Sequence, residues 1–123
     1  MTQPIDETFR FEDGALFRDV TPQRGTPFEH TCPVDAYCDL AWAAIELATV
    51  GFTLETLADQ VRNRPRDKYD NHEPWASCTN AAVAIAFWKD RGLLSIRRRR
   101  NHVDGGYCFE DAMIEFHALA ENG

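Results

Sequence analysis

Residues 77–109 read SCTNAAVAIAFWKDRGLLSIRRRRNHVDGGYCF, and they contain the signals for a helix followed by a hairpin. Either Ser77 or Thr79 can cap the helix, because a hydroxyl oxygen accepts a hydrogen bond from a backbone N–H of the first turn. Gly92 is placed to end it, since glycine readily adopts the left-handed conformation that often follows a helix. We therefore predict a helix over residues 77–91.

A strand pattern follows this helix and leads into four consecutive arginines, Arg97–Arg100. Asp104-Gly105 has the composition of a two-residue hairpin turn, in which both residues need a positive φ. The sequence therefore predicts a hairpin over residues 93–109, with a return strand over residues 107–109. The apolar residues of the first strand are Leu93, Leu94 and Ile96.

The phrase FWKDRGLL, residues 87–94, resembles the junction between the third helix and the wing of winged helix-turn-helix domains. In that family a large apolar residue stands four positions before a glycine, and two apolar strand residues follow. The phrase GFTLETLADQV, residues 51–61, resembles the family's second helix. The resemblance covers about residues 35–110. It implies an α+β fold, a winged-helix-like three-helix core with a C-terminal wing hairpin, which hosts DNA binders and protein-interaction modules alike.

Three further helices are predicted from apolar periodicity and end signals. The first covers about residues 33–50, and the second covers residues 53–63 with Thr53 as its cap. A short C-terminal helix covers about residues 110–120. We expect the four helices to surround the hairpin and to bury a common set of side chains: Trp42, Leu57, Ile85, Trp88 and Leu93.

The N-terminal part is expected to add a β-hairpin or an extended arm over residues 8–32, after a disordered tail at residues 1–7. Asp13-Gly14 is the predicted turn of this hairpin. Residues 21–32 are expected to be irregular, because they contain two prolines and a glycine before the first helix. No compositional break divides the chain, so we predict a single domain with its winged-helix core at residues 33–123.

The helix over residues 77–91 has two apolar faces. One fits packing against the preceding helices, and the other carries Asn80, Val83 and Phe87. Major-groove readers use Arg, Lys, Asn or Gln, and Asn80 alone supplies one at this helix end. An apolar outward face indicates a cover: the connector at residues 62–76, the N-terminal hairpin or a partner subunit. That connector is also longer than the 3–4 residues of a helix-turn-helix.

Charge is distributed unevenly along the chain. The net charge is −7, yet residues 62–109 carry +5, whereas residues 1–61 carry −8 and residues 110–123 carry −4. Such asymmetry indicates a basic face on an acidic body. No apolar run approaches the roughly 18 residues of a membrane span, and the acidic, polar N-terminus does not resemble a signal peptide. We therefore expect a cytoplasmic protein without membrane contact.

The basic face makes nucleic acid the leading predicted partner, with double-stranded DNA binding and transcriptional regulation as the expected function. Guanidinium groups on a wing contact phosphates or enter a narrow minor groove. The alternative is a protein-interaction or assembly module, in which the arginines contact an acidic protein surface or the acidic half of a second copy. A third interpretation is that they only solvate the hairpin. The candidate binding residues are Arg97, Arg98, Arg99, Arg100, Asn80, Thr79, Arg62, Arg64, Arg66 and Lys68.

The four cysteines are predicted to be thiols, since a cytoplasmic location keeps them reduced. No pair has the two- to four-residue spacing of a structural zinc site, so we expect no metal and no cofactor; a zinc ion would use Cys32 and Cys38. Cys78 near a helix start and His72 suggest a Cys–His pair. No phosphate-binding loop or nucleophile elbow accompanies them, so no enzymatic activity is predicted.

Overall fold

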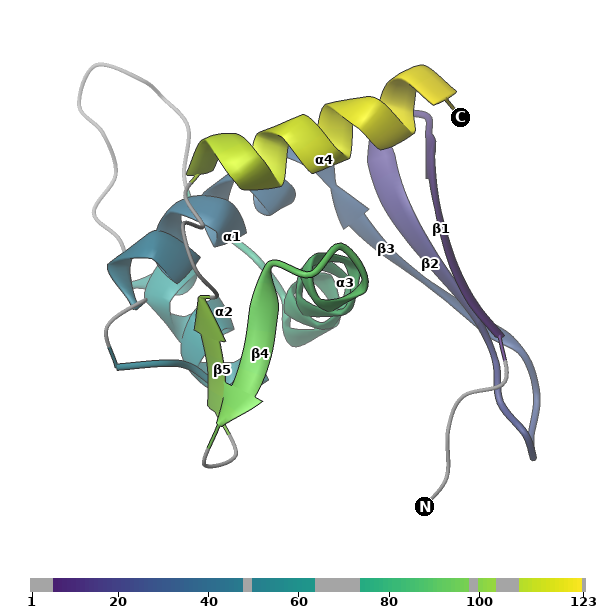
Figure 1. The fold of residues 1–123 in the computed structure, drawn as a ribbon, viewed down its shortest axis with the longest axis horizontal. Helices are drawn as coiled ribbons and strands as arrows, with labels where there is room; N and C mark the ends of the chain where they lie inside the picture. The colour runs from purple at the N-terminus through teal and green to yellow at the C-terminus, as the bar shows by residue number, and fades with distance from the viewer. Residues whose placement is uncertain (1–5, 48–49, 64–73, 98–99, 104–108, 123) are drawn as a thin grey trace.

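The computed structural model describes residues 6–47, 50–63, 74–97, 100–103 and 109–122. In chain order its elements are β1 (Asp6–Glu12), β2 (Ala15–Thr21), β3 (Phe28–Pro33), α1 (Val34–Glu46), α2 (Leu54–Arg62), α3 (Cys78–Asp90), β4 (Leu94–Arg97), β5 (Arg100–Val103) and α4 (Phe109–Asn122). β1, β2 and β3 form an antiparallel sheet in that order, and β4 pairs with β5 in a separate hairpin. The predicted α+β class is confirmed. Figure 1 shows α3 between the two sheets, with α4 across the top of the molecule.

The N-terminal hairpin is confirmed, with the predicted turn, but β1 begins at Asp6, so the prediction of a disordered tail is wrong at Asp6 and Glu7, which pair with β2. Asp13 and Gly14 have φ values of 52° and 76°. A two-residue turn with positive φ at both positions matches the twist of the strands that it joins. The register then pairs Glu12 with Ala15 directly across the turn.

A third strand, β3, was not predicted, so the irregular assignment of residues 21–32 is wrong over Phe28–Cys32. Its residues alternate between the two faces of the sheet, and Cys32 pairs with Leu16 of β2. Both side chains are fully buried. The residues that disfavour a strand, Pro22, Gly25 and Pro27, stand before β3 in its connection from β2.

Local capping fixes where α2 and α3 begin. Thr53 Oγ1 accepts a hydrogen bond from the Thr56 N–H at 3.2 Å. At α3, Ser77 Oγ accepts from the Asn80 N–H at 3.0 Å, and Asn80 Oδ1 accepts from the Ser77 N–H at 3.1 Å. This reciprocal pair satisfies two backbone donors that a helix start leaves without partners. Gly92 follows α3 with a φ of 76°, as predicted.

The predicted helices are all present, although two of them begin or end elsewhere. α1 covers Val34–Glu46 rather than residues 33–50, because Pro33 is the last residue of β3. α4 begins at Phe109, a residue that was predicted to lie in the return strand of the second hairpin.

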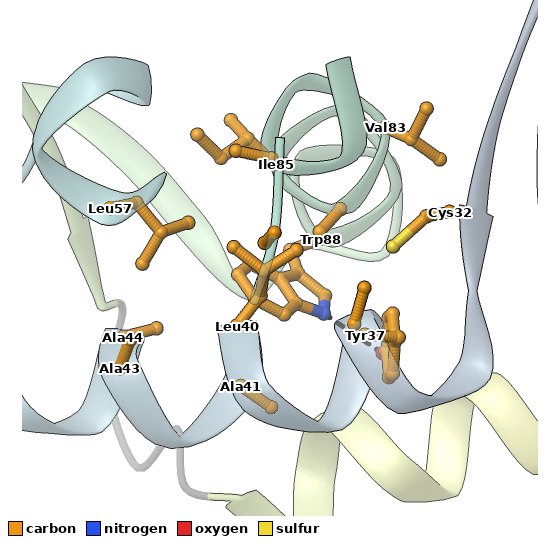
Figure 2. Close-up of a cluster of buried hydrophobic side chains, with 14 of the residues drawn as sticks. Cys32, Tyr37, Leu40, Ala41, Ala43, Ala44, Leu57, Val83, Ile85 and Trp88 are labelled. Carbon is orange, nitrogen blue, oxygen red and sulfur yellow. Dashed lines mark hydrogen bonds between the residues drawn. The ribbon is translucent and has the colours of Figure 1, made fainter. Parts of the chain in front are cut away.

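The predicted core is confirmed at most of its positions. Leu57, Ile85 and Trp88 are buried, and Figure 2 shows Trp88 pointing from α3 toward α1. Leu93 is partly buried against the same cluster. Trp42 is 46% exposed, so its predicted burial is wrong.

The position of Trp42 follows from helical geometry. It stands two residues from Leu40 and two from Ala44, both of which are fully buried. Two residues turn an α-helix by about 200°, so Trp42 lies on the opposite side of α1. The nearly uniform apolar composition of α1 concealed which of its faces is outward.

A buried chain of hydrogen bonds joins three helices. Trp88 Nε1 of α3 donates to the Tyr37 hydroxyl of α1 at 2.9 Å, drawn as a dashed line in Figure 2. The Tyr37 hydroxyl donates in turn to the Ala112 carbonyl of α4 at 2.6 Å. Both aromatic side chains are fully buried. This series of hydrogen bonds therefore holds α4 against α1 and α3.

The second hairpin has a different turn from the one predicted. β4 and β5 pair from Leu94 opposite Val103 to Arg97 opposite Arg100. The chain therefore reverses between Arg97 and Arg100, and the prediction of a reversal at Asp104-Gly105 is wrong. Residues 104–108 lie outside the described part of the chain.

Candidate nucleic-acid interface

The face of α3 that was predicted to point outward is covered by the N-terminal sheet. Val83 and Phe87 are fully buried. The Phe87 ring lies edge-to-face with Phe9 of β1, with centroids 5.4 Å apart. Figure 2 shows Val83 on the side of α3 that faces Cys32, while Ile85 points away from it toward α2. The face of α3 that carries Val83 and Phe87 is therefore unavailable to a DNA groove while the sheet is in place, and the partly exposed positions in the middle of the helix, Ala82 and Ala86, carry no hydrogen-bonding side chain.

Asn80, the predicted base reader, makes its hydrogen bonds within the chain. Its Oδ1 accepts from the Ser77 N–H, and its Nδ2 donates to the Thr31 carbonyl of β3 at 2.9 Å. These bonds hold the start of α3 against the sheet. Thr79, the neighbouring candidate, is exposed. Asn80 therefore has a structural role, which engages both ends of its side-chain amide within the chain.

Arg62, at the end of α2, lies beside the start of α3. Its guanidinium donates to Asp59 at 2.5 Å and to the Ala76 carbonyl at 3.4 Å. The hydrogen bond with Asp59 is the largest cause of a raised pKa for Arg62, and Cys78 contributes as well. The other basic candidates of the connector lie outside the described residues: Arg64, Arg66 and Lys68.

The arginine run lies at the reversal of the second hairpin. Arg97 is the last residue of β4 and Arg100 is the first residue of β5. These strand ends lie on the side of the molecule away from α4 (Figure 1). Arg98 and Arg99 lie outside the described residues.

The candidate residues fall into two groups along α3. Thr79, Asn80 and Arg62 gather at its N-terminal end, whereas the hairpin follows its C-terminal end. A helix of this length spans about 20 Å. We therefore treat the hairpin as the candidate interface in its own right.

A charged cluster on the N-terminal sheet was missed by sequence reasoning. Arg10 Nε donates to Asp19 at 3.0 Å, and the guanidinium also contacts Glu12 and Glu29. The hydrogen bond with Asp19 is the largest cause of a raised pKa for Arg10. The turn at Asp13-Gly14 already implied that Arg10 and Asp19 are diagonal neighbours on one face. The contact of Arg10 with Glu29 could not be predicted, because β3, which carries Glu29, was not predicted.

The cysteines differ in exposure. Cys32 is buried, Cys38 is half-buried and Cys78 is exposed, and all three are thiols. Burial is the main cause of the raised pKa of both Cys32 and Cys38. Among the described residues, no three His, Cys, Asp or Glu side chains come together as metal ligands do. His72 and Cys108 lie outside these residues.

We expect iodoacetamide to label Cys78 rapidly in the native protein and to leave Cys32 unlabelled. The thiolate is the reactive form, and burial both shields Cys32 and disfavours its ionisation. Peptide mass spectrometry after brief labelling measures the order of labelling, with labelling in urea as the control. Equal native rates at Cys32 and Cys78 would contradict the buried position of Cys32.

The raised pKa values of Cys32 and Cys38 also make the free energy of unfolding fall as the pH rises above about 8.5, because the unfolded thiols then lose protons that the folded thiols keep.

No helix within the described ranges is long and apolar enough to cross a membrane. The chain matches no known family model, no curated protein and no solved structure.

Proposed function

We propose that the chain binds double-stranded nucleic acid through the β4–β5 hairpin, on a body of winged-helix type. The pairing of Arg97 with Arg100 carries the proposal, because it makes the run of four arginines the reversal of a two-stranded ribbon. The order of α1, α2, α3 and a hairpin agrees with the winged-helix resemblance. The three-stranded N-terminal sheet is an addition to that pattern.

The chemistry of the hairpin suits a phosphate backbone. Guanidinium groups bind phosphate oxygens through paired, charge-assisted hydrogen bonds. A two-stranded ribbon also has a width that the major groove of DNA admits. Four adjacent cations offset locally the net charge of −7, which otherwise repels a polyanion. The expected complex is therefore salt-sensitive and of modest affinity.

Recognition of base sequence by α3 is not part of the proposal. Val83 and Phe87 are covered by the N-terminal sheet, and Asn80 is engaged with Ser77 and Thr31. Phosphate contacts position a protein on DNA but carry no direct sequence information. We therefore expect similar affinities for duplexes of unrelated sequence, and any role in transcription would follow from binding without sequence preference.

We expect wild-type protein to bind a labelled duplex of random sequence, with an affinity that falls about 100-fold from 50 to 200 mM salt if all four arginines contact phosphates. Replacing Arg97 and Arg100 with glutamine should flatten the slope of log affinity against log salt by about 1.8, since each lost contact contributes about 0.9. Replacing all four arginines should remove binding. Fluorescence anisotropy across the salt range measures these slopes.

A matched control replaces Arg18 of β2 and Arg24 of the β2–β3 connection with glutamine, which removes the same charge far from the hairpin in sequence. This control should keep the wild-type salt slope. Two outcomes contradict the proposal: no duplex binding by wild-type protein at about 50 mM salt, or equal losses in the control and hairpin variants. Circular dichroism of each variant verifies that the fold is retained.

A further inference from the structure

We propose that the outer face of the N-terminal sheet binds the β4–β5 hairpin of a second copy of this chain. The outer sheet face is the surface formed by Arg10, Glu12, Phe17, Asp19 and Glu29. The interaction goes beyond nucleic-acid binding, because it gives the hairpin a protein partner and the chain a mode of self-association. The acidic outer sheet face is observed whether or not the hairpin binds nucleic acid, so this inference does not depend on the proposed function.

Three carboxylates converge on one guanidinium on this surface. Arg10 contacts Asp19, Glu12 and Glu29, one from each strand of the sheet. The side chains of Glu12, Glu29 and Asp19 are 57%, 48% and 36% exposed. One cation among three anions leaves a net charge of −2. Each ionised carboxylate also retains lone pairs that can accept further hydrogen bonds from a partner.

The opposite face of the sheet makes the contacts with the helices. Phe9 packs against Phe87 of α3, and Phe11 packs against Phe116 of α4. Successive strand residues point to opposite faces, so Arg10 and Glu12 point away from the core. The Arg10 guanidinium lies over the Phe17 ring, 4.2 Å from its centroid. The outer sheet face is therefore exposed to solvent, while the inner face of the same sheet packs against α3 and α4.

The hairpin is complementary to this surface in charge. Arginine forms paired hydrogen bonds with carboxylates as readily as with phosphates. The run Arg97–Arg100 brings four positive charges to a surface with a net charge of −2, and both lie on a protein whose total charge is −7. Most orientations of two copies are repelled by that total charge, so the complementary orientation is favoured over the others.

A hairpin cannot reach the outer sheet face of its own chain. Figure 1 shows α3 between the hairpin and the sheet, and the sheet presents its inner face to α3. The outer sheet face therefore points away from the hairpin of the same copy. Two outer sheet faces would also repel each other, because both are acidic. The contact is consequently head-to-tail, and such a contact forms open oligomers unless its rotation closes a ring.

Sedimentation velocity at about 20 mM salt tests this contact, since electrostatic attraction is weakly screened at low ionic strength. We expect the weight-average mass of wild-type protein to rise above the monomer mass of 14.0 kDa with concentration, and to return to it near 0.5 M salt. The sheet variant Glu12→Gln/Asp19→Asn/Glu29→Gln should remain monomeric. The hairpin variant with Arg97–Arg100 replaced by glutamine should also remain monomeric.

The sheet variant separates this contact from a general charge effect. It lowers the magnitude of the net charge, which on its own favours association. The control variant Glu55→Gln/Asp90→Asn/Glu121→Gln changes the net charge equally on α2, α3 and α4, and should associate at least as strongly as wild type. Mixing the sheet variant with the hairpin variant should form a discrete dimer, because one supplies only the hairpin and the other only the sheet.

A monomeric wild type at low salt would overturn the inference, as would association of the sheet variant at the wild-type level. A mixture of the two variants that stays monomeric would overturn it too. The sheet variant should still bind duplex DNA, so loss of self-association with retained DNA binding leaves the proposed function intact. Self-association without DNA binding would refute the proposed function alone.

Discussion

Replacing Phe87 by alanine is expected to lower the free energy of unfolding by about 3–5 kcal/mol. Phe87 is fully buried on the face of α3 that meets the N-terminal sheet. Its ring contacts Phe9 of β1 and Tyr37 of α1, and the Arg91 guanidinium lies 5.0 Å from its centroid. Truncation would leave a cavity between the sheet and the helices. Urea titration monitored by circular dichroism measures the loss.

The matched control is Phe28→Ala in β3. Phe28 is the same residue type in the same sheet, but it is 40% exposed. Its replacement should cost about 0.5 kcal/mol, as is usual at exposed positions. A recognition helix with Phe87 facing solvent would give the opposite ranking, with a small effect at Phe87. Equal effects of the two substitutions would mean that the sheet does not cover α3.

Much of the fold was predictable because its signals are local. Asp13-Gly14 fixes a two-residue turn, Thr53 and Ser77 cap helices, and Gly92 ends α3. Each signal depends on the conformation of a few consecutive residues. These local rules identified four helices and the first hairpin without knowledge of what the elements contact.

The features that were missed depend on tertiary contacts. β3 forms because Cys32 and its neighbours complete a sheet that also packs on α3, and no local turn signal announces it. The second hairpin reverses within the arginine run, although Asp104-Gly105 has the better turn composition. The apolar outward face of α3 was predicted from the sequence, but three candidates for what covers it could not be distinguished: the connector at residues 62–76, the N-terminal hairpin and a partner subunit. Choosing among them required the packing of Phe87 against Phe9.

The candidate site was predictable as a composition but not as an arrangement. The arginine run stands out in the sequence, whereas its position at a hairpin reversal came from the register of β4 and β5. Asn80 has the side chain of a base reader, yet the capping box and Thr31 engage it. Ser, Thr, Asn and Asp side chains near a helix start are favoured there because they hydrogen-bond to the local backbone, so composition alone does not assign such a residue to recognition.

Replacing Tyr37 by phenylalanine is expected to lower the free energy of unfolding by about 1–3 kcal/mol. The substitution keeps the ring and removes the hydroxyl that accepts from Trp88 Nε1 and donates to the Ala112 carbonyl. Desolvated donors that lose their acceptor are costly because water cannot replace it in the core. Because the hydroxyl also holds α4, hydrogen exchange in α4 should accelerate in the variant.

A double-mutant cycle with Trp88→Phe isolates the hydrogen bond. Once the indole N–H is absent, loss of the Tyr37 hydroxyl no longer strands a donor on α3, so the double variant should be more stable than additivity predicts, by about 0.5–3 kcal/mol. Thr53→Ala provides the control cycle, since Thr53 caps α2 beyond the far end of α1 and has a separate partner, Thr56. The losses of unfolding free energy caused by Thr53→Ala and by Tyr37→Phe should add within about 0.5 kcal/mol. Additive costs for Tyr37 and Trp88 would show that the two residues stabilise α3 and α4 independently, through packing rather than through the shared hydroxyl.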